Sequence, residues 1–258
     1  MRSHIISQLS YEETLKNLKD YHKILINEIC YTFEFPNFAT NQFIALRKNV
    51  EIGFVSNVLL DWECQAVFEY GKKHIYDEYY PLIVDLIKKV TIPRKVQDYC
   101  CNINYFYAFP PLYHKNMIYS FFINFFEKPI FKNFNSNQSL LEQELMTHIS
   151  AFFRKQNKYG PEQITVAILD DQFLAIMISG LLTPFLREFV NSNIDDALFV
   201  ERMFVVEAKA VLEQILITYF NTQPHEPFIH FDKNNDKLII LSSLSQDKWM
   251  RFLEEMSA

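Results

Sequence analysis

The sequence predicts an α+β protein built from two tandem α-β-β-α-β-β units, each an antiparallel four-stranded sheet packed with helices. Three observations lead to this class. The residue pattern repeats when the chain is shifted by about 123 positions, each half contains paired segments in which apolar residues alternate, and helix-like spacing precedes the first pair. We expect the two copies to form a pseudo-two-fold intrachain dimer, with one repeat at 1–132, a linker at 133–138 and the second repeat at 138–258.

The repeat is clearest where residues 41–60 fall on residues 164–183. Apolar positions agree along both segments, and the turn positions Arg47 and Asp170 coincide. Within these segments Val50 falls on Phe173, and the same shift aligns two further segments, with Tyr105 on Phe228 and Met117 on Ile240. Three aligned segments are harder to obtain by chance than one, so we interpret the first half as a diverged copy of the second.

The helices of the second half follow from apolar spacing and capping residues. Leu141, Leu145 and Ile149 recur at helical intervals and predict a helix over 140–153, which matches a helix predicted over 15–30 in the first half. A short helical stretch is expected at 183–191. A longer helix, capped by Asn193 or Asp195, is expected to reach about Tyr219. A last amphipathic helix is predicted over 246–256.

The strands of the second half follow from alternation and turns. Strands are predicted at 164–168 and 173–177 around Asp170-Asp171, and at 227–231 and 238–241 around the polar segment 232–236. Residues 173–178 are all apolar, so alternation there gives way to burial on both faces. We therefore expect the second face of each sheet to be covered, with the other copy as its partner.

Composition excludes several classes of protein. The chain has 258 residues, of which 49% are hydrophobic and 22% charged, as in a globular protein. Its net charge of −6 and pI near 5.7 argue against nucleic-acid binding, which needs a cationic surface. Its longest apolar runs are far shorter than the roughly 20 residues of a spanning helix. No secretory signal is visible, so we expect no membrane insertion and a cytoplasmic location.

The familiar signatures of catalysis are missing from the sequence. Phosphate-binding glycine motifs and the nucleophile motif G-x-S-x-G do not occur. The cysteines, at positions 30, 64, 100 and 101, have neither C-x-x-C spacing nor neighbouring histidines. We therefore predict no catalytic residue, no cofactor and no metal, and expect a protein that is not an enzyme.

One motif has a definite local chemistry, the segment Gly180-Leu181-Leu182-Thr183-Pro184. Glycine permits a positive φ at a strand end, threonine caps a helix, and proline suits the first helical position. Backbone N–H groups at such a helix start attract anions, so Gly180 and Thr183, with the upstream Gly160, are candidate ligands for bicarbonate or phosphate. The simpler interpretation is a strand-to-helix turn without a ligand.

These residues also carry a family resemblance. The order Tyr159-Gly160-Pro161-Glu162, then Asp170-Asp171, then Gly180-Leu181-Leu182-Thr183-Pro184, resembles the MpsC-like domain over about 138–245. That family is named for a component of a proposed Na⁺-translocating membrane-potential-generating system. The first half departs from the pattern, with Asn57 and Leu60-Asp61 at the positions of Gly180 and Thr183-Pro184.

The resemblance implies a non-enzymatic, cytosolic accessory protein of a membrane Na⁺ or inorganic-carbon transport system. Such a protein would act by contacts with membrane transporter subunits, at the membrane only through that partner, and whether it also forms a homo-oligomer is left open. The alternative is a small-ligand or anion-binding regulatory module with its pocket near the Gly180–Pro184 turn.

Overall fold

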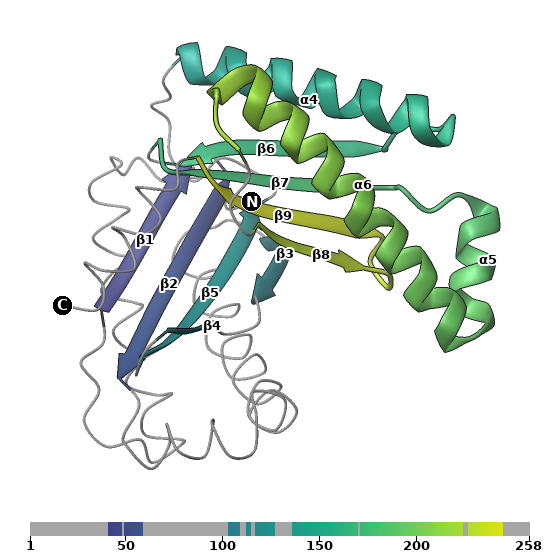
Figure 1. Cartoon of the computed structure of the whole chain (residues 1–258), viewed down its shortest axis with the longest axis horizontal. Coiled ribbons are helices and arrows are strands. Elements are labelled where there is room, and N and C mark those ends of the chain that lie inside the picture. Colours follow the sequence, from purple (N-terminus) through teal and green to yellow (C-terminus); the bar gives the residue numbers. More distant parts are fainter. Residues whose placement is uncertain are drawn as a thin grey trace, which may run out of the picture. The chain divides into compact units, whose positions relative to one another are not determined.

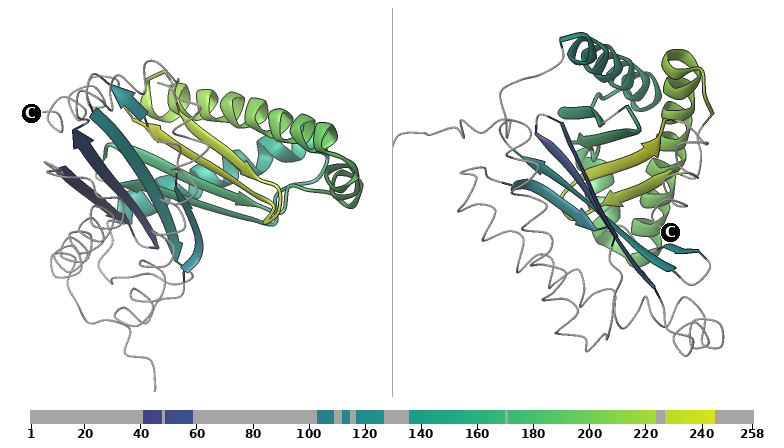
Figure 2. Two further views of the ribbon diagram at one scale, coloured as in Figure 1. Left: turned by 90° about the horizontal axis from the view of Figure 1, so that it is seen from below. Right: turned by 90° about the vertical axis from the view of Figure 1, so that its left-hand side faces the viewer.

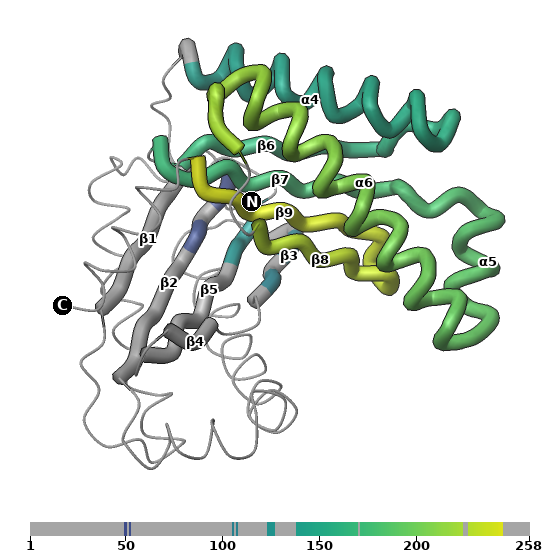
Figure 3. The backbone as a smooth tube through the Cα atoms, in the orientation of Figure 1, coloured from purple at the N-terminus to yellow at the C-terminus, as the bar shows by residue number. Residues whose placement is uncertain are grey.

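The computed structural model describes residues 41–47, 49–58, 103–108, 112–114, 117–126, 136–169, 171–223 and 227–244 (Figures 1 and 3). The chain divides into two compact units. The first comprises Met1–Asn133 with Leu253–Ala258, and the second comprises Phe134–Phe252. The helices predicted at 15–30 and 246–256, and all four cysteines, lie outside the described residues.

The second unit is built on a four-stranded antiparallel sheet. Its strands are β6 (Gln163–Leu169), β7 (Phe173–Ser179), β8 (Phe228–Asp232) and β9 (Lys237–Ser243), in the spatial order β6-β7-β9-β8. Two hairpins therefore meet through β7 and β9, the strands at the centre of the sheet. The predicted α+β class and both hairpins are confirmed, with each strand within two residues of its predicted bounds.

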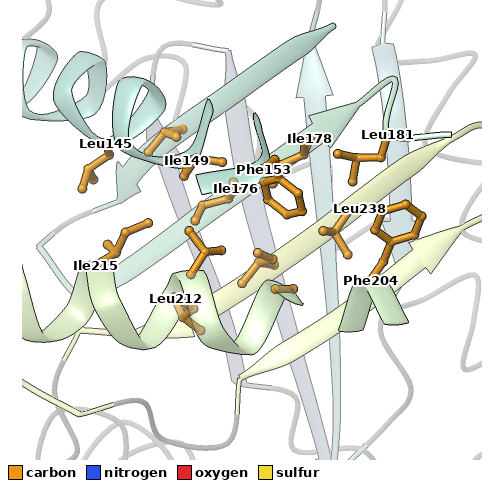
Figure 4. Close-up of a cluster of buried hydrophobic side chains, with 14 of the residues drawn as sticks. Leu145, Ile149, Phe153, Ile176, Ile178, Leu181, Phe204, Leu212, Ile215 and Leu238 are labelled. Carbon is orange, nitrogen blue, oxygen red and sulfur yellow. The ribbon is translucent and has the colours of Figure 1, made fainter. Parts of the chain in front are cut away.

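Three helices accompany this sheet: α4 (Ser136–Asn157), α5 (Pro184–Ser192) and α6 (Ile194–Phe220). Helices α4 and α6 cover one face of the sheet, as the views in Figure 2 show. Leu145, Ile149 and Phe153 of α4 lie one helical turn apart and are fully buried, as the spacing predicts. They pack with the buried side of α6 and with the strand residues between them (Figure 4).

A buried carboxylate attaches α4 to the edge of the sheet. Glu142 is 2% exposed, and its Oε1 accepts a hydrogen bond of 3.2 Å from the Ile168 N–H of the edge strand β6. An unpaired strand edge is a template for association with other chains. Glu142 therefore secures the helix and protects one position of that edge at the same time.

The opposite face of the sheet is also apolar and buried. Leu169, Ala175 and Ile239 on this face have no exposed surface, and Met177 has 1%. All six residues from Phe173 to Ile178 are buried, so the prediction that both faces are withdrawn from water is confirmed.

The first unit contains a second antiparallel sheet, with strands β1 (Asn41–Arg47), β2 (Val50–Val58), β3 (Ile103–Ala108) and β5 (Met117–Phe126). Its strand order is β1-β2-β5-β3, and the short β4 (Leu112–His114) also pairs with β5. The order is the same as in the second unit: a hairpin, then the last strand, then the third strand at the edge. The burial of Val50, Ile52, Ile123 and Phe125 gives this sheet an apolar face as well.

Three details of the predicted repeat are wrong. Among the described residues, the sheet of the first unit has five strands instead of the predicted four, because the short β4 also pairs with β5. If Val50 is aligned with Phe173, strand pairing aligns Phe125 with Ser243, an offset of 118 residues instead of 123. A uniform shift fails because turns and connections differ in length between the halves. The predicted linker is also too long, since α4 already begins at Ser136.

Candidate functional site

The turn between β7 and α5 contains the sharpest sequence motif, and its conformation explains the glycine. Gly180 has a φ of +75°, in the left-handed region where a side chain is strained. A Cβ at this position would also lie 2.6 Å from the Cβ of Glu162. The Glu162 N–H in turn donates to the Ser179 carbonyl at 2.9 Å, which holds the two segments together.

Thr183 and Pro184 begin α5 as predicted. The Thr183 Oγ1 accepts a hydrogen bond of 3.3 Å from the Leu186 N–H, and Pro184 occupies the first helical position. The next helix, α6, is capped by Asn193 and not by Asp195, with the Asn193 Oδ1 accepting from the Asp196 N–H at 2.9 Å. Local sequence thus determines both helix starts.

A carboxylate from a distant part of the chain lies at the centre of the turn. Asp236, only 8% exposed, accepts hydrogen bonds of 3.0 Å from the N–H groups of both Leu181 and Leu182 at one oxygen. Its other oxygen accepts from Arg187 Nη2 at 3.0 Å. The Arg187 Nε also donates to the Leu182 carbonyl at 3.2 Å, so one guanidinium bridges the carboxylate and the turn.

The hairpin between β8 and β9 positions that carboxylate. Asp232 accepts from the N–H groups of Asn234 and Asn235 and folds the hairpin turn, which confirms the turn predicted over 232–236. Asp236 itself has a φ of +50°, a conformation that Asp tolerates better than most residues. Its backbone carbonyl accepts from the Gly180 N–H at 3.2 Å. Asp236 therefore contacts the turn through both main chain and side chain.

This arrangement changes how the predicted anion site must be interpreted. The N–H groups of Leu181 and Leu182 already bind an anion, the carboxylate of Asp236. A soluble anion at these N–H groups would have to compete with the carboxylate of Asp236, which is part of the same chain. Among the described residues, no hydrogen bond joins Gly160 to the Gly180–Pro184 turn. A Cβ on Gly160 would meet the Arg154 side chain of α4.

Two half-buried titratable groups lie outside the turn. Burial raises the pKa of Glu207 on α6, and the hydrogen bond of 3.1 Å from Asn157 Nδ2 at the end of α4 opposes that rise. On β8, burial lowers the pKa of His230, an effect that the nearby Asp232 charge opposes. Among the residues that the structure describes, no three His, Cys, Asp or Glu side chains gather as a metal site would require.

An apolar surface lies where α5 meets α6. We define the α5–α6 patch as the following side chains: Phe185, Phe189, Ile194, Leu198 and Phe199. Phe185, Ile194 and Phe199 are 70%, 76% and 62% exposed, and α5 has no fully buried residue at all. Phe185 stacks on Phe189 with ring centroids 6.0 Å apart, and Phe189 meets Phe199 edge-on at 6.5 Å. Local sequence gave no indication of this patch, because the exposure of Phe185 and Phe199 depends on how the two helices pack.

Part of the chain is similar to a known family. Residues 137–223 match the MpsC family model. That model is described as a Na⁺-translocating membrane potential-generating system (MpsC). The resemblance predicted for the second half is therefore confirmed. No curated protein and no solved structure matches the chain.

The MpsC match has clear boundaries in the fold. It covers α4, β6, β7, α5 and α6, and it includes the Gly180–Pro184 turn and the whole α5–α6 patch. It ends before β8, so Asp236 lies beyond it. None of the helices in the described part of the chain combines the length and the apolar character needed to cross a membrane.

The first prediction concerns Asp236. Replacement by Ala leaves two buried N–H groups without their acceptor, each costing about 1–3 kcal/mol, so Asp236→Ala should lower the free energy of unfolding by about 2–6 kcal/mol. Asp236→Asn keeps an acceptor oxygen and the left-handed backbone, and should lose less. Urea denaturation measures both variants, with the exposed Lys233→Ala of the same turn as a control. A stability of Asp236→Ala equal to that of the wild type would contradict this role.

The second prediction concerns Glu207. Because its pKa is raised in the folded state, the ionised form costs stability above that pKa, and the cost disappears as pH falls below the unfolded value of 4.5. Glu207→Gln should therefore be more stable than the wild type at about pH 7, with the difference closing toward about pH 4. Denaturation across this range tests it, with the exposed Glu213→Gln on the same helix as a control. A variant of equal or lower stability at every pH would refute the assignment.

Proposed function

We propose that the protein is a non-enzymatic, cytosolic accessory component of a membrane Na⁺ or inorganic-carbon transport system that generates a membrane potential. The single observation that carries this proposal is the MpsC match over residues 137–223. In this proposal the protein reaches the membrane only through contacts with transporter subunits.

The surface and the turn of the second unit support action by protein contacts. The polar groups of the Gly180–Pro184 turn are engaged by Asp236 and Arg187, in an arrangement that stabilises structure. The α5–α6 patch offers clustered exposed aromatic rings, and clustered exposed apolar side chains are characteristic of interaction surfaces.

We also propose that the first unit is a diverged copy of the second and that the copies pair about a pseudo-two-fold axis. The order shared by four strands of each sheet supports common descent, since a hairpin followed by an inserted last strand occurs in both. Two apolar sheet faces, one in each unit, supply the surfaces that such pairing requires.

A second candidate function is binding of a small anion at the Gly180–Pro184 turn. The observation that favours it is the convergence of the Leu181 and Leu182 N–H groups on one carboxylate, because the backbone is thereby already arranged for an anion. This function requires the ligand to displace the side chain of Asp236.

The third prediction tests the accessory role. A tagged chain expressed in its native host and purified from detergent-solubilised membranes should retain membrane subunits of the transport system, and its deletion should lower the Na⁺-dependent membrane potential. The tag alone serves as the control. Unaltered potential in the deletion strain, together with no retained membrane protein, would exclude this function.

The fourth prediction separates the second candidate. Millimolar bicarbonate or phosphate should leave the melting temperature of the wild type unchanged, because Asp236 already satisfies the turn. In Asp236→Gly, which keeps the left-handed backbone and empties the carboxylate position, the same anions should raise it. A clear shift in the wild type that is lost on substitution of Thr183 would instead support a native anion site.

A further inference from the structure

The α5–α6 patch combines exposure with order, which distinguishes it from scattered apolar surface residues. Three phenylalanine rings from two helices contact one another in sequence, yet the outer two remain 70% and 62% exposed. Ile194 adds an aliphatic side chain at the start of α6 and is 76% exposed. Apolar side chains that pack together and still face water provide a preformed surface for a partner.

The patch lies on the elbow formed by α5 and the start of α6, and hydrogen bonds hold this elbow at both ends of α5. Thr183 caps the start of α5, and Arg187 attaches its first turn to the buried Asp236. At the junction with α6, Asp196 Oδ2 accepts hydrogen bonds of 2.6 Å from Ser192 Oγ and from Asn193 Nδ2. A patch on a fixed elbow costs little ordering free energy when it binds.

The charges around the patch are unbalanced. Residues 184–202 contain four acidic and two basic side chains, and one of the basic ones, Arg187, is already bound to Asp236. Glu188 and Asp195 are exposed on this stretch. The surroundings agree with the whole second half of the chain, where residues 138–258 have a net charge of −7. The exposed Arg202 also lies on this stretch, so the surroundings of the patch are acidic on balance and not at every position.

We propose that the α5–α6 patch binds an amphipathic, lysine- and arginine-rich segment of a membrane protein partner. The inference rests on the proposed accessory function and names the surface and the chemistry of its partner. Apolar side chains of the segment would cover Phe185 and Phe199, and its basic side chains would meet Glu188 and Asp195. Cytoplasmic loops of membrane proteins are rich in Lys and Arg, so such a partner supplies this chemistry.

Two other occupants of the patch, a second copy of this chain and a membrane surface, are disfavoured by charge. A second copy docked symmetrically would bring together two surfaces that are acidic on balance, which is repulsive. A membrane surface rich in anionic lipid would repel the same acidic side chains. A basic segment is the occupant that satisfies both the apolar patch and its acidic surroundings.

The test uses a labelled amphipathic peptide of about 18 residues with Leu on one face and Lys on the other, and its counterpart with Glu in place of Lys. Binding to the full chain is measured by fluorescence anisotropy. The patch variant is Phe185→Ser/Phe199→Ser. The matched control is Tyr159→Ser/Ile217→Ser, which removes two exposed apolar side chains elsewhere. Melting curves establish that both variants remain folded.

We expect the Leu/Lys peptide to bind the wild type and the control alike, with affinity falling about tenfold or more in the patch variant. Glu188→Gln/Asp195→Asn should weaken binding and reduce its salt dependence, and the Leu/Glu peptide should not bind. Equal binding by patch variant and control would overturn the proposal. So would patch-dependent self-association in ultracentrifugation, or patch-dependent binding to vesicles containing anionic phosphatidylglycerol.

Failure of the proposed docking surface can be distinguished from failure of the proposed accessory function. If the patch variant still co-purifies with membrane subunits as the wild type does, the docking surface is wrong and the function stands. If neither protein co-purifies, the proposed function itself fails.

Discussion

The second unit depends on one buried carboxylate that joins segments more than fifty residues apart. Asp236 belongs to the β8–β9 hairpin, and the groups it binds belong to the β7–α5 turn. Such charge-assisted bonds in a buried place are stronger than neutral ones, and an unmet partner is costly. The position of the hairpin, the conformation of the turn and the direction of α5 therefore depend on one another. A change in any of them that moved Asp236 away would leave the Leu181 and Leu182 N–H groups without an acceptor.

This constraint connects the fold to the proposed function. Gly180 supplies the backbone conformation, Asp236 fixes the turn, and Thr183 starts the helix that carries Phe185. Helix α5 has no fully buried residue, and only Leu186, Phe189 and Val190 pack partly against the core, so the fixed exit from β7 contributes to its direction. The polar contacts at the turn thus help to orient the helix that carries Phe185 and Phe189 of the α5–α6 patch. The MpsC match includes the turn and the patch but ends before Asp236.

What could be predicted from the sequence was local. The positive φ of Gly180, the caps at Thr183 and Asn193, and the burial of both sheet faces follow from residues within a few positions of each other. Long-range partners had no such signal: nothing in the sequence connects Asp236 with Leu181, or Glu142 with Ile168. The uniform repeat offset failed for a related reason, because hydrophobic pattern does not register loop length. Exposure at Phe185 and Phe199 depends on helix packing, so pattern alone could not separate them from core residues.

Native-state hydrogen exchange of the Leu181 and Leu182 amides tests the central claim most directly. If Asp236 holds the turn as described, both amides should exchange only when the second unit unfolds, with opening free energies close to that unit's global value from denaturation. Exchange several kcal/mol easier than global unfolding would mean that the turn opens on its own, and the carboxylate could not then be what fixes α5.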